Sequence, residues 1–274
     1  MNDFYYVDGD GTTHVLWRGG DNRERAVLAG SEAGEGMLGE PYIEKTPNLL
    51  SNNYRDWLFD TREYGFEIKA HAANPRDLET IIGNWNDWHD PLLGEGYIKR
   101  LTRGGRVRCL SCIPNAPEWT FDDPLHATCK QGYTAACPWW HSEDATTVNS
   151  AFNGAVPVAV ACTNNGDIPA WPVITITGIV NTPVMTNSDG KLITVNESMA
   201  NADDVMVIDC RPWGDTRRYI YYQVHGAGAE VPCRTSSDTT FIRIPKGTNN
   251  LDIVATAGTP TISIVYFHYY RGLY

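Results

Sequence analysis

The sequence predicts a mostly β protein with one long helix, and three features lead to this prediction. Residues 64–73 alternate apolar and polar side chains, which is the period-two pattern of a strand with one buried face. Residues 74–89 place apolar side chains at helical spacing behind an Asn-Pro start. Beyond residue 156, short β-branched runs alternate with turn residues, and no convincing helix interrupts them.

Length and composition fit a folded protein of one large or two modest domains. The chain has 274 residues, of which 42% are hydrophobic and 20% charged. No segment has the long apolar run of a membrane span, and the acidic, aromatic amino terminus does not resemble a secretory signal. A net charge of -11 argues against tight nucleic-acid binding but allows a protein past which DNA slides.

The first part of the chain is expected to hold short strands and then a unit of strand, helix and hairpin. Glycines punctuate the segment up to about residue 61, which indicates strands joined by long loops, with Asp21 and Asn22 in one turn. Farther on, Gly104 and Gly105 can occupy both positive-φ positions of a hairpin turn. The elements predicted here are strands at 13–18, 24–28, 64–73, 97–102 and 106–113 and a helix at 74–89.

A domain boundary is predicted near residues 143–148, where charged and small polar residues interrupt the apolar pattern. The first domain then spans residues 1–144, and the second spans residues 145–274. Residues 113–143 are aromatic, rich in cysteine and without clear periodicity, and they are interpreted as an irregular insert in the first domain. The last strand of the chain is a candidate to return to the first domain.

The second domain is expected to begin with a strand, a tight turn and a second strand. The apolar run Val158–Ala161 fits a strand buried on both faces, and the alternation around Ile174 and Ile176 fits a half-buried one. The turn between them, in which an Asn-Gly-Asp sequence supplies positive-φ positions, consists of Asn164, Asn165, Gly166 and Asp167. Further strands are predicted at 191–196, 205–209, 217–222, 240–245, 251–255 and 261–266. Strands at this spacing predict an antiparallel sandwich of jelly-roll type.

Four cysteines are weak candidates for a metal site: Cys109, Cys112, Cys129 and Cys137. Zinc takes four thiolate or imidazole ligands in a tetrahedron, and a two-residue gap lets two thiolates bind one ion. The downstream pair has a much longer gap, however, and the upstream pair falls on a predicted strand, where the two side chains point to opposite faces. Buried free thiols are expected for these and for Cys162, Cys210 and Cys233, so neither a metal nor a cofactor is predicted.

No arrangement of residues in the sequence indicates catalysis. Asp122-Asp123 and Asp203-Asp204 could be carboxylate pairs for glycoside hydrolysis, but adjacent residues of a strand point apart, and solvated loop charge is the preferred interpretation. Gly94-Glu95-Gly96 lacks the lysine and helix that follow a phosphate-binding loop. The histidines show no metal-binding pairing. The residues therefore give no support for catalysis, and a hydrolase is the least favoured interpretation of the sequence.

The aromatic content leaves open a sugar-binding surface. The chain has 9 tryptophans and 14 tyrosines, and flat rings can stack on the apolar faces of sugars. Trp171 and Trp213 are the candidate glycan contacts. The alternative, which we prefer on the sequence, is that the aromatic side chains fill cores and subunit interfaces.

The segment 65–110, which includes the predicted strand, helix and hairpin, resembles one protein family. It is similar to the amino-terminal domain of the distal tail proteins of long-tailed siphophages, which form the hub between tail tube and tail tip. The resemblance is strongest in the order of Leu78, Pro91, Gly96, the Gly104-Gly105-Arg106 turn and Arg108.

The second half of the chain resembles the same family. The turn 164–167 and the residues after it are similar to the segment that marks the second domain of this family. The matching residues after the turn are Ala170, Pro172, Ile174, Ile176 and Gly178. Three further segments are similar to family strands and turns: Val207-Ile208-Asp209 followed by Arg211-Pro212 and Arg217, the segment FIRIPKGTNN at 241–250, and the aromatic end at 265–271.

The resemblance implies a tail-tube-like first domain, a β-barrel or sandwich with one helix that forms a ring, and a galectin-like second domain. It implies a structural virion protein, made in the host cytoplasm, that forms a homohexameric hub at the tail tip. Its expected partners are further copies of itself, the tail tube protein, tail-tip proteins and receptor-binding proteins, with DNA only in transit. The alternative is a carbohydrate-binding accessory protein that docks host cell-wall glycans through the sandwich.

Overall fold

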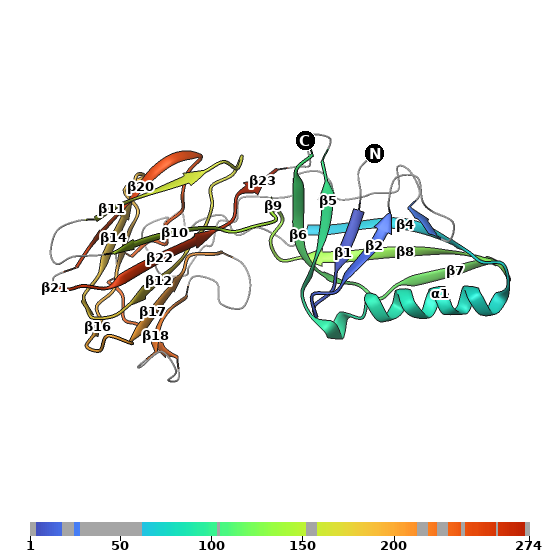
Figure 1. Ribbon diagram of the computed structural model, residues 1–274, viewed down its shortest axis with the longest axis horizontal. Helices are drawn as coiled ribbons and strands as arrows, with labels where there is room; N and C mark the ends of the chain where they lie inside the picture. The colour runs from blue at the N-terminus through green and yellow to red at the C-terminus, as the bar shows by residue number, and fades with distance from the viewer. Residues whose placement is uncertain are drawn as a thin grey trace, which may run out of the picture. The chain divides into compact units, whose positions relative to one another are not determined.

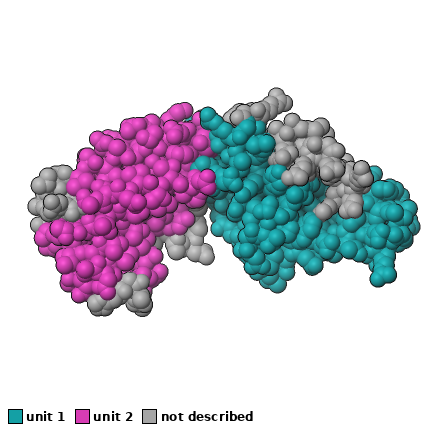
Figure 2. All heavy atoms as spheres, in the orientation of Figure 1, with its two compact units in different colours: residues 1–143, 271–274 teal, residues 144–270 magenta. Residues whose placement is uncertain are grey.

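The computed structural model describes residues 4–17, 25–27, 62–102, 105–151, 158–212, 219–223, 230–236, 239–255 and 257–271. The chain divides into two compact units, residues 1–143 with 271–274 and residues 144–270 (Figure 2). The division after residue 143 falls at the edge of the boundary region that the sequence predicts. The Asp21-Asn22 turn and Gly104 lie outside the described residues.

The first unit is one antiparallel sheet with a helix against it (Figure 1). The main path of the sheet runs β2-β1-β5-β6-β8-β4-β3, with β7 paired to β8 and β9 paired to β6. The two end strands β2 and β3 lie in contact, so the sheet curls back on itself. Its elements are β1 (Phe4–Val7), β2 (Thr13–Trp17), β3 (Arg25–Val27), β4 (Arg62–His71), α1 (Pro75–Trp88), the 3-10 turn η1 (Pro91–Leu93), β5 (Gly96–Leu101), β6 (Val107–Pro114), β7 (Glu118–Asp123), β8 (His126–Ala135) and β9 (Trp140–Ser142).

Helix α1 begins and ends where the sequence predicts. The side chain of Asn74 accepts a hydrogen bond of 3.0 Å from the backbone nitrogen of Asp77, which satisfies one of the free amides of the first turn. Leu78 is buried with three alanines: Ala70 of β4, Ala72 just after that strand, and Ala127 of β8. The small alanine side chains leave room for the helix, so larger side chains at these positions would interfere with its packing.

The segment 113–143 is not irregular, and this prediction is wrong. It contains β7, β8 and β9, and all ten residues of β8 pair with β4 from Arg62↔Ala135 to His71↔His126. Strand β8 therefore lies inside the sheet. Its inward side chains include alanines, Cys129 and Gln131, which have too little apolar character to give a clear alternating pattern.

Gln131 shows how a polar residue is accommodated at a buried position of β8. Its side chain is 1% exposed, accepts a 3.0 Å hydrogen bond from the indole nitrogen of Trp85, and donates one of 2.8 Å to the carbonyl of Asn115. These bonds connect α1, β8 and the loop between β6 and β7. A buried amide that keeps its partners costs little, whereas one that loses them costs the full desolvation free energy.

The second unit consists of antiparallel sheets with orders β10-β22-β12-β17-β18-β19, β11-β20-β14-β15 and β16-β13-β21. Its strands are β10 (Thr146–Ala151), β11 (Val158–Asn164), β12 (Val173–Thr177), β13 (Val180–Asn181), β14 (Val184–Asn187), β15 (Leu192–Thr194), β16 (Ser198–Met199), β17 (Val205–Asp209), β18 (Tyr219–Gln223), β19 (Val231–Pro232), β20 (Gly247–Val254), β21 (Ala257–Gly258), β22 (Thr261–Tyr266) and β23 (Tyr269–Tyr270).

The two larger sheets of this unit each bury one face. In the six-stranded sheet the isoleucines of β12 and β22 are buried, including Ile174 and Ile264, while the residues between them are partly exposed. The hydroxyl of Tyr266 on β22 donates a 3.0 Å hydrogen bond to the carbonyl of Thr163 on β11, which connects the two sheets. The prediction of a mostly β protein with one long helix is confirmed for the described part of the chain.

Strand β11 differs from its prediction. Its burial alternates, so that Val160 and Cys162 are buried while Ala159, Ala161 and Thr163 are exposed. The strand is therefore buried on one face, and not on both as the apolar run indicates. Alanine can stand on either side of a sheet, so a Val-Ala alternation looks like continuous apolar sequence although only its valines need burial.

Three other strand predictions need correction. Residues 240–245 form only a single bridge, Ala170↔Ile244, and the described part of this segment contains no strand. Strand β20 spans Gly247–Val254, so it begins before the strand predicted at 251–255 and includes the end of the segment 241–250. Strands β1, β10 and β14 have no counterpart in the predictions, because each is short and mixes polar with apolar residues.

Replacing Leu78 by alanine tests the packing of α1. The side chain is 2% exposed, so the change leaves a cavity and should lower the free energy of unfolding by about 2 to 5 kcal/mol. Urea denaturation, followed by the spectroscopic signals of the helix and of the aromatic side chains, measures this change. Ile179 in the second unit is 47% exposed, and Ile179→Ala should change it by no more than about 0.5 kcal/mol. Equal effects of the two changes would contradict the assigned packing.

Candidate functional site

The turn that follows β11 is held by a buried amide side chain. Asn164 is 1% exposed, and its side-chain nitrogen donates to the carbonyls of Ile168 at 2.8 Å and Ile244 at 3.0 Å. Its side-chain oxygen accepts a 2.9 Å hydrogen bond from the backbone nitrogen of Gly166. One side chain thus bonds to the backbone of two irregular segments, which are otherwise held there by the single bridges Ile168↔Tyr269 and Ala170↔Ile244.

Gly166 is required by a close approach of two backbones. A Cβ added at this position would lie 2.8 Å from the backbone nitrogen of Tyr269 and closer still to its carbonyl oxygen. That carbonyl accepts hydrogen bonds from Asp167 at 2.8 Å and Ile168 at 3.2 Å. Gly166 has no positive φ, so the predicted reason for this glycine is wrong, and the close approach of the two backbones is what excludes a side chain here.

His268 joins the same turn to the start of the second unit. The backbone nitrogen of Asn165 donates to Nδ1 of His268 at 3.3 Å, and Nε2 of this ring lies 3.0 Å from Oγ1 of Thr146 on β10. The exposed Asp167 forms a 3.5 Å ion pair with Lys246. The four predicted turn residues are therefore engaged in contacts that stabilise the fold.

The cysteines are separate free thiols. The candidates Cys109, Cys112, Cys129 and Cys137 are all buried. Burial raises the pKa of the Cys129 thiol to about 12 and the pKa of the Cys162 thiol to about 11. Within the described residues, no group of three or more histidine, cysteine or acidic side chains is arranged to hold a metal ion.

The two aspartate pairs are not arranged for catalysis. Asp204 is 2% exposed and accepts hydrogen bonds from the backbone nitrogens of Ala200 at 3.1 Å and Asn201 at 3.0 Å, so it closes a loop before β17. Asp123 is exposed and accepts from Leu125 at 2.8 Å, while Asp122 accepts from Thr128 at 3.1 Å. Asp204 thus stabilises its own loop and Asp123 its own turn, while Asp122 also lies 3.9 Å from Lys69 of β4.

A buried aromatic cluster in the first unit was not foreseen from the sequence. The His89 ring stacks on Tyr6 at 4.8 Å and Trp85 at 4.3 Å, and its Nε2 lies 2.9 Å from the Tyr133 hydroxyl. The neighbouring His14 stacks on Trp88, with the ring centres 4.5 Å apart. The cluster combines residues from β1, β2, α1 and β8, and such long-range proximity leaves no local pattern in a sequence.

An ion pair borders this cluster. Nε2 of His14 lies 2.7 Å from Oδ2 of Asp8, and both side chains are largely buried. Burial opposes ionisation of Asp8, but hydrogen bonds from His14 and from the backbone nitrogens of Thr12 and Asp10 outweigh it and lower the pKa of this carboxyl. The pair holds the loop between β1 and β2 in place.

The predicted glycan contacts are not confirmed as a surface. Trp171 is 9% exposed and packs edge-on against Tyr269, with ring centres 5.6 Å apart, so its ring does not present an open face. Trp213 lies outside the described residues. A sugar-binding surface on the second unit would therefore have to use other side chains.

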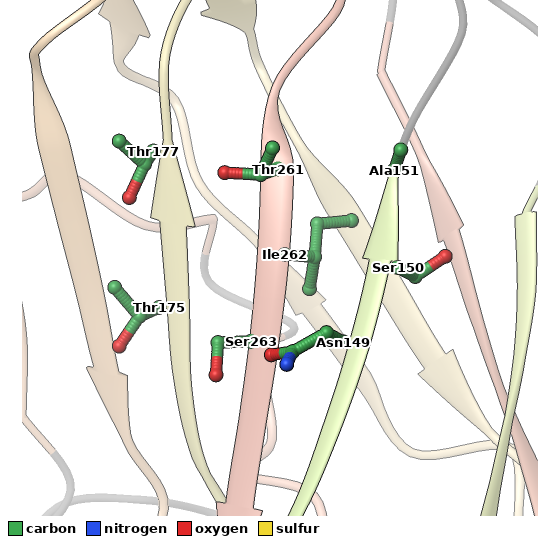
Figure 3. Close-up of a pocket in the computed structure, with 8 residues that line it drawn as sticks. All are labelled: Asn149, Ser150, Ala151, Thr175, Thr177, Thr261, Ile262 and Ser263. Carbon is green, nitrogen blue, oxygen red and sulfur yellow. The ribbon is translucent and has the colours of Figure 1, made fainter.

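One shallow hollow lies on the outer face of the six-stranded sheet (Figure 3). It has a volume of about 480 Å³ and spans three neighbouring strands, β10, β22 and β12. The lining residues are small and uncharged: Asn149, Ser150, Ala151, Thr175, Thr177, Thr261, Ile262 and Ser263. The hollow has no acid, base or thiol, so its lining can bind through neutral hydrogen bonds but offers no group for proton transfer or nucleophilic attack.

Replacing Gly166 by alanine tests the close approach at the turn. The added methyl group must displace the backbone at Tyr269, so the free energy of unfolding of the second unit should fall by about 1 to 3 kcal/mol, measured by urea denaturation. Gly83 in α1 has open space around it, and Gly83→Ala should raise the stability of the first unit by about 0.5 to 1 kcal/mol. A neutral effect of Gly166→Ala would contradict the assigned role.

Replacing Asp8 by asparagine tests the buried ion pair through its pH dependence. Because the pKa of Asp8 is lowered in the folded state, the ionised carboxylate stabilises the fold fully above its unfolded pKa of about 4, and this contribution disappears as the pH falls below that value. Asp8→Asn should therefore lower stability by about 1 to 3 kcal/mol at pH 7. The difference from the unmodified protein should shrink between about pH 4 and pH 2 in urea titrations; a pH-independent difference would argue against the ion pair.

Among the described residues, no helix is both long enough and apolar enough to cross a membrane. No protein-family model matches the sequence, and a search of curated proteins gives no significant match.

Solved structures do show similarity. The chain superimposes on the crystal structure of the Dit protein of phage SPP1, described as a paradigm of the hub adsorption apparatus in phages that infect Gram-positive bacteria, with a TM-score of 0.58. The match covers 98% of this chain and 99% of that chain at 13% identity. A chain of the phage p2 baseplate in its activated conformation gives a TM-score of 0.48 at 10% identity, covering 97% of this chain and 98% of that chain. At this identity the likeness to SPP1 Dit shows that the two chains share a fold.

Proposed function

We propose that this protein is the structural hub at the distal end of a long non-contractile phage tail. The observation that carries the proposal is the whole-chain fold similarity to SPP1 Dit, with a TM-score of 0.58 over 98% of the chain. The sequence resemblance of the strand, helix and hairpin segment and of the turn 164–167 to siphophage distal tail proteins supports it independently. The protein acts by shape and assembly, and not by catalysis.

The proposed assembly is a homohexameric ring through which the genome passes. Ring closure requires a heterologous interface, in which different surfaces of neighbouring copies meet and repeat by rotation. The net charge of -11 suits a wall past which DNA must slide, because a basic wall would bind the phosphates. The ring would join the tail tube protein to tail-tip and receptor-binding proteins in the virion.

Within this ring, residues 64–113 make the contacts between copies, and the second unit faces outward. An exposed apolar side chain in this segment supports the division, because Leu92 is 91% exposed at the turn between α1 and β5. Burial of this side chain in an interface would remove apolar surface from water, which is favourable.

The assembly state of the purified protein tests the proposal. Mass photometry should give particles of about 183 kDa, six times the chain mass of 30.5 kDa, and negative-stain images should show closed six-fold rings. A protein that stays monomeric at all accessible concentrations, or that forms only open chains, would contradict the hub function.

A matched pair of variants tests which surface closes the ring. Leu92→Glu places a charge in the proposed interface and should shift the population toward smaller particles. Val231 is 42% exposed on the second unit, and Val231→Glu should leave the rings intact. The opposite result would keep the ring but assign its contacts to the second unit.

A further inference from the structure

The outer face of the six-stranded sheet of the second unit is poor in charged side chains. Along the described strands β10, β22, β12, β17, β18 and β19 the only charged residue is Asp209, which is 3% exposed and bound by Arg211 at 2.6 Å. One residue in five of the whole chain is charged, so this face differs from the rest of the protein. A surface this poor in charge does not attract ions or charged polymers.

Strand register places the polar groups of this face in rows. Ser263 of β22 pairs with Thr175 of β12 on one side and with Asn149 of β10 on the other. Two residues along, Thr261 pairs with Thr177 in the same way. Paired residues lie about 5 Å apart and successive rows about 7 Å apart, so the hollow in Figure 3 is a small grid of hydroxyl and amide groups.

The side chains of these polar groups have no hydrogen-bond partner among the residues that the structure describes. They are the side chains of Asn149, Thr175, Thr177, Thr261 and Ser263. By contrast, the hydroxyl of Thr163 on the four-stranded sheet is bonded to that of Thr248 at 3.0 Å. The hollow therefore keeps free donors and acceptors on adjacent strands, where a ligand can reach several of them together.

A neutral polyhydroxylated ligand matches this lining. Hydroxyl and amide groups both donate and accept, so they pair with sugar hydroxyls without requiring a charge on either side. A phosphate or carboxylate would meet no cation in this lining. The lining also exposes methyl groups of its threonines and alanine beside the hydroxyl and amide groups, and this mixture suits the C–H and O–H groups of a sugar. We propose that the hollow on β10, β22 and β12 is a binding site for a neutral oligosaccharide.

The same face offers room for more than one sugar unit. Thr175 pairs with Val207 of β17, and Val207 pairs with Tyr221 of β18, so all three side chains point to the outer face. Tyr221 is half-buried and lies about 10 Å from Thr175, which is two strand spacings. An oligosaccharide that lies across the strands can contact the hydroxyl grid at one end and the tyrosine ring at the other.

The site is shallow, so each copy binds weakly, with a dissociation constant of about 1 mM. Several copies held together would bind a repetitive glycan far more tightly through avidity. The proposal concerns one chain, however, and it does not depend on the hub function.

Binding of defined sugars to the intact protein tests the proposal. Saturation-transfer NMR with neutral hexose and N-acetylhexosamine oligosaccharides should show contacts, and uronate-containing oligosaccharides of equal length should not bind. Binding should be insensitive to salt, because no charged group takes part. The double variant Thr175→Val with Ser263→Ala keeps the strand shape and should bind at least about tenfold more weakly.

Thr186→Val provides the matched control. Thr186 lies on β14 in the other sheet and is also partly exposed, so its replacement removes a similar hydroxyl without touching the hollow. It should bind as the unmodified protein does. The proposal would be overturned if no neutral oligosaccharide bound up to about 10 mM, or if the double variant bound as well as the unmodified protein. It would also be overturned if self-association protected the backbone amides of β10 and β22 from hydrogen exchange, because this face would then be a subunit interface.

Discussion

The buried amide of Asn164 is the interaction on which the second unit most depends. The chain leaves β11 there and crosses irregular segments whose backbone carbonyls, at Ile168 and Ile244, have to be satisfied away from water. One asparagine donates to both and accepts from the backbone of the turn. Gln131 does the same in the first unit, where it connects a helix, a strand and a loop. In both units a buried amide makes an otherwise costly irregularity possible.

Strong local patterns were sufficient to predict some of the elements. The helix has an Asn-Pro start and apolar side chains at helical spacing, and both its ends were predicted because each signal lies within one turn of its effect. Strand β8 was missed because its inward side chains include Ala127, Cys129 and Gln131. Their burial depends on α1 and β4, which lie far away in the sequence. The predictions fail where a residue's environment is set by distant segments.

The turn 164–167 shows where local sequence reasoning misses the cause of a residue's role. An Asn-Gly sequence predicts positive φ, yet Gly166 is needed because the backbone of Tyr269, about a hundred residues later, passes too close for a Cβ. The hollow on the six-stranded sheet could not be predicted at all. Its polar groups come from three strands, of which β10 and β22 are more than a hundred residues apart in the sequence, and only the register of β22 with both neighbours brings them into rows.

The distribution of charge links the proposed roles. A protein with a net charge of -11 is repelled by DNA and by acidic polymers, which is appropriate for a channel but unfavourable for attachment to a surface of the same sign. A sheet whose outer face is poor in charge avoids this conflict, because neutral hydrogen bonds gain nothing from opposite charge and lose nothing to salt. The cost is low affinity per copy, since each hydroxyl exchanges a water for a sugar with little net gain. Such a face becomes effective only when several copies act together, as in a ring.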